Sequence, residues 1–381
     1  MDAPIYPFKP IHSIRALALA LGESEQLLER LATRADQMYR HVPQEKKVKP
    51  GKPPEMRDTY DAHEPLKRVQ RKLVDRILSK ATFPPYLHGG IKDRKSPRSI
   101  HSNAAVHAGA RFVILQDIRN FYPSILKRHV DALFRGLFGF GASVAALLSS
   151  ICTREGSTPQ GASTSGYIAN LVFWDVEPKI VKGLLGRGFQ YTRFADDITI
   201  SCGRKPSSDE LTNIVSTITG MLAAKGCHQK RTKLHLRVRG QGIKADGAIF
   251  QPVTVTGLSV FNSSPGLTKL ERRRIRSAVR EFEVMSESTN NWSDLESTYH
   301  RAMGRVGRLL ACGHPDGAML KERLNLVMRS YQAPLLERYQ QAIVANSNTE
   351  TRSLAAPPFL STHRSKTVLY LGSKEAGTAT R

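Results

Sequence analysis

Apolar residues recur at helical spacing near the start of the chain. The pattern predicts a first helix over 13–21, ended by Gly22, and a second that begins after Ser24, within 12–41. Residues 64–80 predict a longer amphipathic helix. Its apolar side chains would share one face: Leu66, Val69, Leu73 and Ile77.

Strand patterns lie in the middle of the chain. Residues 111–118 begin with a continuous apolar run, which predicts a strand buried on both faces. Residues 189–201 alternate apolar and polar positions on both sides of Asp196 and Asp197, which predicts a hairpin. Residues 43–58, rich in Lys, Pro and Gly, predict a loop or an irregular hairpin, and 230–260 predict strands and turns.

The remaining segments favour helices. The predicted ranges are 129–152, 161–182, 209–225, an Arg-rich helix from Leu267, and 296–343. In the Arg-rich helix, one face carries Ile275, Val279 and Phe282, and a neighbouring face carries Arg272, Arg276 and Arg280. Such an arginine stripe favours phosphate contact, and an ordinary solvated face is the alternative.

Composition narrows the classes of protein. The 381 residues include 57 Lys+Arg against 33 Asp+Glu, a formal charge of +24. That charge favours a polyanionic partner, with a solubility device or a ribosome-associated scaffold as the alternative. The four cysteines are far apart and form no zinc or disulfide pattern. No apolar run is long enough to span a bilayer and no signal-peptide core is present, so we expect a cytoplasmic protein without a membrane partner.

Three carboxylates carry the candidate chemistry. Asp117 ends the predicted buried strand, and Asp196 and Asp197 form the tip of the predicted hairpin. Strand ends in one sheet can gather such groups, which would repel one another unless cations neutralise them. Mg²⁺ prefers oxygen ligands, and two such ions can drive phosphoryl transfer. An ordinary acidic turn is the alternative for the Asp-Asp pair.

The order and spacing of three segments resemble the catalytic core of reverse transcriptases. Residues 116–125 (QDIRNFYPSI) resemble the first palm motif. Residues 158–162 (TPQGA), followed by 168–171 (IANL), resemble the second, although Ser163 and Gly166 stand where prolines are common. Residues 194–197 (FADD) resemble the metal-binding box, with Phe194 in place of Tyr. The resemblance runs from about residue 20 to about 330 and implies an α+β, right-hand polymerase fold: fingers, a palm with an antiparallel sheet backed by helices, and a helical thumb.

Two short motifs are similar to those of the retron branch. Residues 103–107 begin with Asn103 and end with His107, as in an Asn-Ala-x-x-His motif. Val255, Thr256 and Gly257 match a Val-Thr-Gly triplet. The resemblance implies contacts of both motifs with RNA or DNA. A structural histidine and a plain turn are the respective alternatives.

The resemblance also implies a division of the chain. We expect an N-terminal helical extension over 1–48, fingers and palm over 49–260 and a helical thumb over 261–345. Residues 346–381 form a tail that we expect to be partly disordered, apart from a short apolar run at 367–371.

Site roles follow from the same resemblance. Asp117, Asp196 and Asp197, with the Ile118 carbonyl, would hold two Mg²⁺ ions, for which Mn²⁺ can substitute. Tyr122 matches the steric gate that selects deoxynucleotides, and a core aromatic is its alternative. The nucleotide pocket would be completed by three further residues: Gln160, Gly161 and Lys230.

Cations of the fingers and thumb would meet phosphates. Arg57 is the best match for the triphosphate, with Lys52 weaker and open to a plain surface role. Residues 255–262 resemble the primer-grip turn. The arginine stripe at 272, 276 and 280 would begin a thumb that holds the template–primer duplex, mostly through its backbone.

Three hypotheses for function remain. The first is a retron reverse transcriptase that copies a cognate structured non-coding RNA into a branched single-stranded DNA from deoxynucleoside triphosphates, in anti-phage defence, with an effector or toxin protein from the same locus. The second is another defence-associated reverse transcriptase with untemplated synthesis. The third is a non-catalytic RNA-binding scaffold, against which the three aspartates argue.

Overall fold

The computed structural model describes residues 3–46, 54–93, 96–230, 234–238, 253–289 and 291–347. The first part of the chain, up to residue 223, contains the shorter helices. They are α1 (Ile14–Leu21), α2 (Glu25–Arg34), η1 (Ala35–Gln37), α3 (Leu66–Arg76), η2 (Leu78–Lys80), α4 (Ile100–Val106), α5 (Phe121–Ser124), α6 (Lys127–Gly136), α7 (Ala142–Cys152), α8 (Ser165–Leu171), α9 (Glu177–Gly186) and α10 (Ser208–Ala223). Three long helices follow: α11 (Lys269–Ser288), α12 (Trp292–Ala311) and α13 (Asp316–Ser347).

The strands are short outside the central sheet. They are β1 (Tyr39–His41), β2 (Gln44–Lys46), β3 (Glu55–Arg57), β4 (Tyr60–Ala62), β5 (Leu87–His88), β6 (Phe112–Arg119), β7 (Gln190–Phe194), β8 (Asp197–Cys202), β9 (His228–Gln229), β10 (His235–Val238), β11 (Thr254–Val255) and β12 (Leu258–Ser259). The central sheet has the order β10-β6-β8-β7-β5, and β9 also pairs with β6. Its pairs are antiparallel except β5 with β7, which is parallel.

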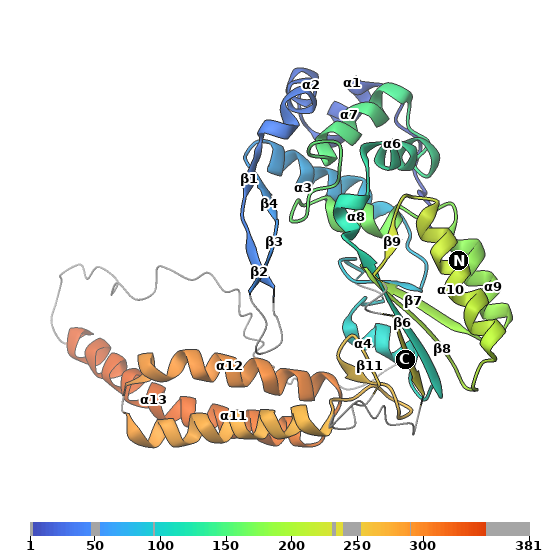
Figure 1. Cartoon of the computed structure of the whole chain (residues 1–381). Coiled ribbons are helices and arrows are strands. Elements are labelled where there is room, and N and C mark those ends of the chain that lie inside the picture. The colour runs from blue at the N-terminus through green and yellow to red at the C-terminus, as the bar shows by residue number, and fades with distance from the viewer. Residues whose placement is uncertain are drawn as a thin grey trace, which may run out of the picture.

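Both faces of this sheet are covered, as the apolar run at 111–118 predicts. Ile114 and Ile118 face a core that they share with α9 and α10, whereas Val113 lies in a second core with α4 and β11–β12. Figure 1 shows α9 and α10 along one side of the sheet and α4 with β11 on the other. The strand that carries Asp117 is therefore fixed from two sides.

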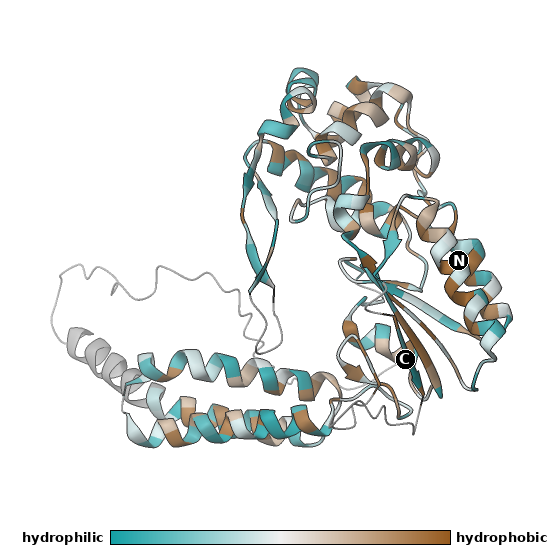
Figure 2. Cartoon of the chain, viewed as in Figure 1, coloured by the Kyte–Doolittle hydropathy of each residue, from teal (hydrophilic) through white to brown (hydrophobic). Residues whose placement is uncertain are grey.

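The second core continues into the three-helix bundle. Ile275, Val279 and Phe282 of α11 are buried, as their spacing predicts. They pack in one cluster with Val255 and Leu258 from the sheet side, and Figure 2 shows the polar outer faces of the bundle. An antiparallel sheet backed by helices and a separate helical bundle are the parts that the resemblance implies. The boundaries at 48, 260 and 345 stay a prediction, and the buried cluster spans the second of them.

Local signals explain the first helices. The hydroxyl of Ser13 accepts from the backbone N–H of Ala16, and that of Ser24 accepts from Leu27, both at 3.2 Å. Gly22 ends α1 with a φ of 59°, the left-handed conformation that glycine adopts readily. The predicted helical range reaches residue 41. The second helix instead ends at Arg34, and strand β1 begins at Tyr39.

Two predicted helices are each broken in two. The range 129–152 contains α6 and α7, because the chain turns at Gly139 with a φ of 67° and Gly141 lies against the His12 carbonyl. The range 161–182 contains α8 and the first part of α9, with a turn over 172–176. Among the described residues, no helix is long and apolar enough to cross a membrane. Residues 348–381, including the apolar run at 367–371, lie outside the described part of the chain.

Candidate active site

Strand register brings two of the predicted carboxylates face to face. Asp117 of β6 is the cross-strand partner of Asp197 at the start of β8. Ile118 donates its backbone N–H to the Asp196 carbonyl at 3.0 Å, so the hydrogen-bonded pair is the neighbouring one. Asp117 and Asp197 therefore form a non-hydrogen-bonded pair, the kind in which side chains come closest. Asp117 is only 6% exposed, while Asp197 is exposed.

The third carboxylate belongs to the turn between β7 and β8. Ala195 adopts a φ of 54°, which is unfavourable for a residue with a Cβ, and Asp196 follows it. A residue in a strand directs its N–H and C=O to the same side, so the Ile118 carbonyl faces this turn. The hairpin tip and the strand end thus converge as the sequence predicts.

The described side chains do not, however, close around a metal. Within the described residues, no three His, Cys, Asp or Glu groups are placed so that they could hold one ion together. The register explains this result, because Asp117 and Asp197 are direct partners whereas Asp196 lies one residue earlier, in the turn. The oxygen-only donor set still fits Mg²⁺, which typically takes one or two carboxylates and completes its shell with water and phosphate.

A cavity of about 220 Å³ adjoins the pair of carboxylates. It is lined by parts of β6 and β8, by His235 of β10 and by the turn between β11 and β12. Asp117, Asp197, Thr199, Thr256 and Gly257 are among its lining residues. The turn that resembles a primer grip therefore stands beside the candidate catalytic groups.

Tyr122 follows β6 and is partly buried against the core, where its ring packs near Phe121. Burial raises the pKa of its hydroxyl, the charge of Asp196 raises this pKa further, and Arg57 and Arg193 act in the opposite direction. Arg57 is exposed at the end of β3. Lys52 lies outside the described residues.

The second motif, at 158–162, packs against β4. Tyr60 of β4 donates its N–H to the Gln160 carbonyl at 2.7 Å. Gly161 has a φ of 108°, and a Cβ there would lie 2.8 Å from the Tyr60 carbonyl oxygen. Only glycine permits this approach without displacement. Lys230 is brought in separately, since its N–H donates to the Asp117 carbonyl at 2.8 Å.

The two retron-like motifs contact each other. Asn103 in α4 donates to the Thr256 hydroxyl at 3.4 Å, and that hydroxyl donates to the Ile100 carbonyl at 3.0 Å. Thr256 has a φ of 47° and Gly257 a φ of 80°, so the turn is tight and left-handed. Val255 is buried, whereas Gly257 is exposed at the cavity.

The structure favours the structural alternative for His107. The residue is 1% exposed, and its ring nitrogens lie 2.7 Å from the Ser201 hydroxyl and 2.8 Å from that of Thr192. Burial lowers its pKa to about 3, so the ring is neutral, with one nitrogen donating and the other accepting. Asn103 is also fully buried, so neither side chain is placed to touch nucleic acid directly. A contact of these two residues with RNA or DNA stays a prediction.

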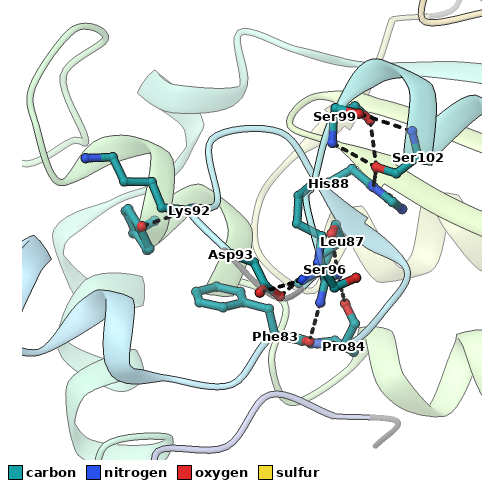
Figure 3. Close-up of polar contacts among 11 residues, drawn as sticks. Phe83, Pro84, Leu87, His88, Lys92, Asp93, Ser96, Ser99 and Ser102 are labelled. Atoms are coloured by element: carbon teal, nitrogen blue, oxygen red, sulfur yellow. Dashed lines mark hydrogen bonds and ion pairs between the residues drawn. The ribbon is translucent and has the colours of Figure 1, made fainter. Parts of the chain in front are cut away.

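The segment before α4 is folded by an arginine. The Arg98 guanidinium donates to the carbonyls of Phe83, Pro84 and Leu87 at 2.7 to 3.0 Å. Figure 3 shows these acceptors together with His88, whose Nδ1 lies 3.1 Å from the Ser102 hydroxyl. This network fixes the start of α4 against β5, and thereby the helix that carries Asn103 and His107.

The three arginines of the predicted stripe on α11 contact other side chains of the protein. The Arg276 guanidinium pairs with Asp316 at the start of α13, and Arg272 lies 3.0 Å from the His314 ring. Arg280 has Glu283 at 3.7 Å. The stripe thus joins α11 to the α12–α13 connection in part, which leaves Arg280 as its most exposed cation.

Sequence reasoning missed a buried charge behind the turn. Arg193 of β7 is 0% exposed and forms an ion pair at 2.7 Å with Glu177 of α9. The alternating pattern at 189–201 puts Arg193 on the same side of β7 as the apolar Phe189 and Tyr191, and α8 and α9 cover that side. An arginine directly before the Asp-Asp box was the available signal.

Comparison with known proteins agrees with this geometry. The reverse transcriptase (RNA-dependent DNA polymerase) family matches residues 61–261. Retron Se72 reverse transcriptase of Salmonella heidelberg is 31% identical over 331 residues, which cover 87% of this chain and 83% of that protein. Retron Ec48 reverse transcriptase of Escherichia coli is 28% identical over 330 residues, covering 84% and 76%. Apo telomerase of Candida tropicalis aligns with a TM-score of 0.42 at 10% identity, over 81% of this chain and 63% of that one, too distant to add to the assignment.

The chain belongs to the reverse transcriptase family and has its right-hand polymerase fold. It is an RNA-directed DNA polymerase, which uses an RNA template and deoxynucleoside triphosphates. Within the family it is a retron-type reverse transcriptase.

Proposed function

We propose that this enzyme copies part of a cognate structured non-coding RNA into single-stranded DNA that stays joined to the RNA through a 2′-5′ branch. The relatives named as retron reverse transcriptases support this reading over untemplated synthesis. So does the contact between Asn103 and Thr256, which joins the two retron-like motifs beside the candidate site. A formal charge of +24 suits a protein that holds folded RNA and its DNA product.

The observation that carries the chemistry is the cross-strand pairing of Asp117 with Asp197 beside the cavity. These two carboxylates, with Asp196 and the Ile118 carbonyl, would hold two Mg²⁺ ions, and Mn²⁺ can substitute. Bound ions of this kind activate the attacking hydroxyl and neutralise charge on the leaving group.

The chain's own residues would select and orient the nucleotide. Tyr122, five residues after Asp117 in the first motif, would block a ribose 2′-hydroxyl. Arg57 and Lys230 are exposed cations that would suit the triphosphate and the departing pyrophosphate. Gly161 allows the backbone of the second motif to approach the Tyr60 carbonyl closely, and Gln160 precedes it in the chain.

The wider role extends this proposal. We expect the DNA product and the RNA to remain bound, with Arg272, Arg276 and Arg280 near the duplex backbone. We also expect an effector or toxin protein from the same locus and a role in anti-phage defence. A cytoplasmic location is part of the same proposal.

The test uses the full chain purified with its co-bound nucleic acid from the native locus. Labelled deoxynucleotides and Mg²⁺ are added, and the protein is compared with Asp196→Asn and Asp197→Asn. A discrete DNA whose size changes on ribonuclease treatment, absent in both variants, is the expected result. Synthesis that ignores the RNA would favour the untemplated class, and synthesis that is equal in the variants would overturn the catalytic assignment.

A further inference from the structure

The buried ion pair behind the catalytic turn is an unusual construction. The side chains of Arg193 and Glu177 are 0% and 2% exposed. Removing two charges from water is costly, and apolar residues of similar size often stabilise a core better. Stability alone is therefore a weak reason for this pair.

The contacts of Arg193 account for its whole hydrogen-bonding capacity. Its guanidinium donates twice to the Glu177 carboxylate, at 2.7 and 2.8 Å. It donates to the carbonyls of Ala169 and Asn170 at the end of α8, at 3.0 and 2.8 Å. The remaining bond goes to the Ala195 carbonyl at 3.3 Å. A guanidinium has five N–H donors, so all are used.

The Ala195 carbonyl belongs to the residue before Asp196. Ala195 has a φ of 54°, a backbone conformation that persists only when its surroundings impose it. Two backbone bonds help, from Ala195 to the His88 carbonyl at 3.3 Å and from Ile118 to the Asp196 carbonyl at 3.0 Å. Arg193 adds a side-chain bond to the Ala195 carbonyl.

Glu177 and Tyr191 orient the guanidinium in turn. The Tyr191 hydroxyl donates to Glu177 Oε1 at 2.7 Å. The Arg193 guanidinium carbon also lies 5.3 Å from the centre of the Phe173 ring. The Glu177 carboxylate is thus held by two side chains of β7, those of Tyr191 and Arg193. Since Glu177 neutralises Arg193 at contact distance, the pair acts through geometry more than through net charge.

We propose that Arg193, held by Glu177 and Tyr191, is a positioning residue that fixes the Ala195–Asp196 peptide and so the placement of the adjacent aspartates. This inference rests on the proposed metal-binding role of those aspartates. The arginine ties the turn to the end of α8, so the second motif and the Asp-Asp box keep a fixed relation. Lysine cannot reproduce this role, because it lacks the planar fork that reaches several acceptors at once.

The test measures the Mg²⁺ concentration for half-maximal DNA synthesis by the full chain with bound nucleic acid, well below its melting temperature. For Arg193→Lys, we expect this concentration to rise roughly 10-fold or more, as for residues that orient metal ligands. Tyr191→Phe removes one hydroxyl and should shift it less, in the same direction. Glu210→Gln is the matched control, because it neutralises the acid of the more exposed Arg204–Glu210 pair.

Three outcomes separate the claims. A raised Mg²⁺ requirement in Arg193→Lys and Tyr191→Phe, with Glu210→Gln like wild type, supports the inference. A folded Arg193→Lys whose Mg²⁺ requirement stays within about twofold of wild type overturns the inference. If Arg193→Lys fails to fold, the same criterion is applied to Tyr191→Phe. Full activity of Asp196→Asn would instead overturn the proposed function itself.

Discussion

One face of the palm sheet has an open end and a closed end. At the open end, Asp117 and Asp197 are cross-strand partners beside a cavity. At the closed end of the same face, Ser201 and Thr192 bond to His107 and are buried. We expect the carboxylates at the open end to bind partners from outside the protein, whereas the polar groups at the closed end hydrogen-bond to one another. Both ends carry family motifs, so a motif alone does not distinguish chemistry from scaffolding.

The largest expected effect is at the open end. Asp117→Asn or Asp197→Asn should lower DNA synthesis by about 10²–10³-fold or more, because charge stabilisation in the transition state is lost. The melting temperature should stay unchanged or rise, since a repulsive pair is relieved. Single-nucleotide incorporation and thermal melting measure the two effects. Asp75→Asn on the exposed face of α3 is the control, and equal losses in it would remove the distinction.

The closed end should respond in the opposite way. His107→Ala leaves two buried hydroxyls without their partner and should lower the free energy of unfolding by about 2–4 kcal/mol. The incorporation rate per folded molecule should fall far less than in the aspartate variants. Urea denaturation with active-site titration measures both, with His300→Ala on exposed α12 as control. Unchanged stability would show that His107 is not part of the scaffold.

Acid should lower the stability of the protein through two buried histidines, His107 at the closed end and His88 in β5 beside the turn that carries Asp196. Burial lowers the pKa of His107 to about 3 and that of His88 to about 4, from 6.5. The unfolded chain binds these protons first as pH falls, so the stabilisation is complete above pH 6.5 and is lost toward pH 4. Each site contributes a slope of about 1.4 kcal/mol per pH unit. Denaturation at several pH values should show a slope smaller by about one proton in His107→Gln.

A smaller effect is expected where the second motif meets the hairpin region. Gly161→Ala places a Cβ 2.8 Å from the Tyr60 carbonyl, at a φ of 108°. The strain of about 1–3 kcal/mol should displace β4 and raise the KM for deoxynucleotides roughly 10-fold. Gly166→Ala is the matched control, because its Cβ meets nothing within 4 Å. Equal KM values in both variants would separate Gly161 from nucleotide binding.

The smallest effect concerns the arginine stripe. Arg276 is half exposed and pairs with Asp316, so Arg276→Gln should cost about 0.2–1 kcal/mol of stability. Because the proposed function has Arg276 near the duplex backbone, the slope of log K against log salt for duplex binding should also fall by about one. An unchanged slope would show that Arg276 serves only the ion pair with Asp316.

Local sequence signals located the elements well but not their breaks. Ser13, Ser24 and Gly22 mark the first helices, and the apolar run at 111–118 marks β6. The break at 137–141 depends on contact of Gly141 with the distant His12 carbonyl, which periodicity does not encode. The burial of Arg193 depends on helices α8 and α9, which pack over its side of β7 and supply its hydrogen-bond acceptors.

The site followed the same rule. The order of the motifs identified Asp117, Asp196 and Asp197, because those residue types are demanded by the chemistry. Their register, with Asp117 opposite Asp197, depends on pairing between strands far apart in the sequence. The contact between Asn103 and Thr256, and the burial of His107, likewise arise from tertiary packing. Sequence therefore predicts the chemistry, while the structure adds the register and the packing around the candidate residues.

The most direct test of the open end is Mn²⁺ binding by the full chain with bound nucleic acid and a non-reacting deoxynucleotide analogue. Electron paramagnetic resonance reports free Mn²⁺ during the titration, without relying on catalysis. We predict tight sites in wild type that are lost or strongly weakened in Asp117→Asn and Asp196→Asn, and retained in His107→Gln. Identical titrations in the wild type and the aspartate variants would contradict the account.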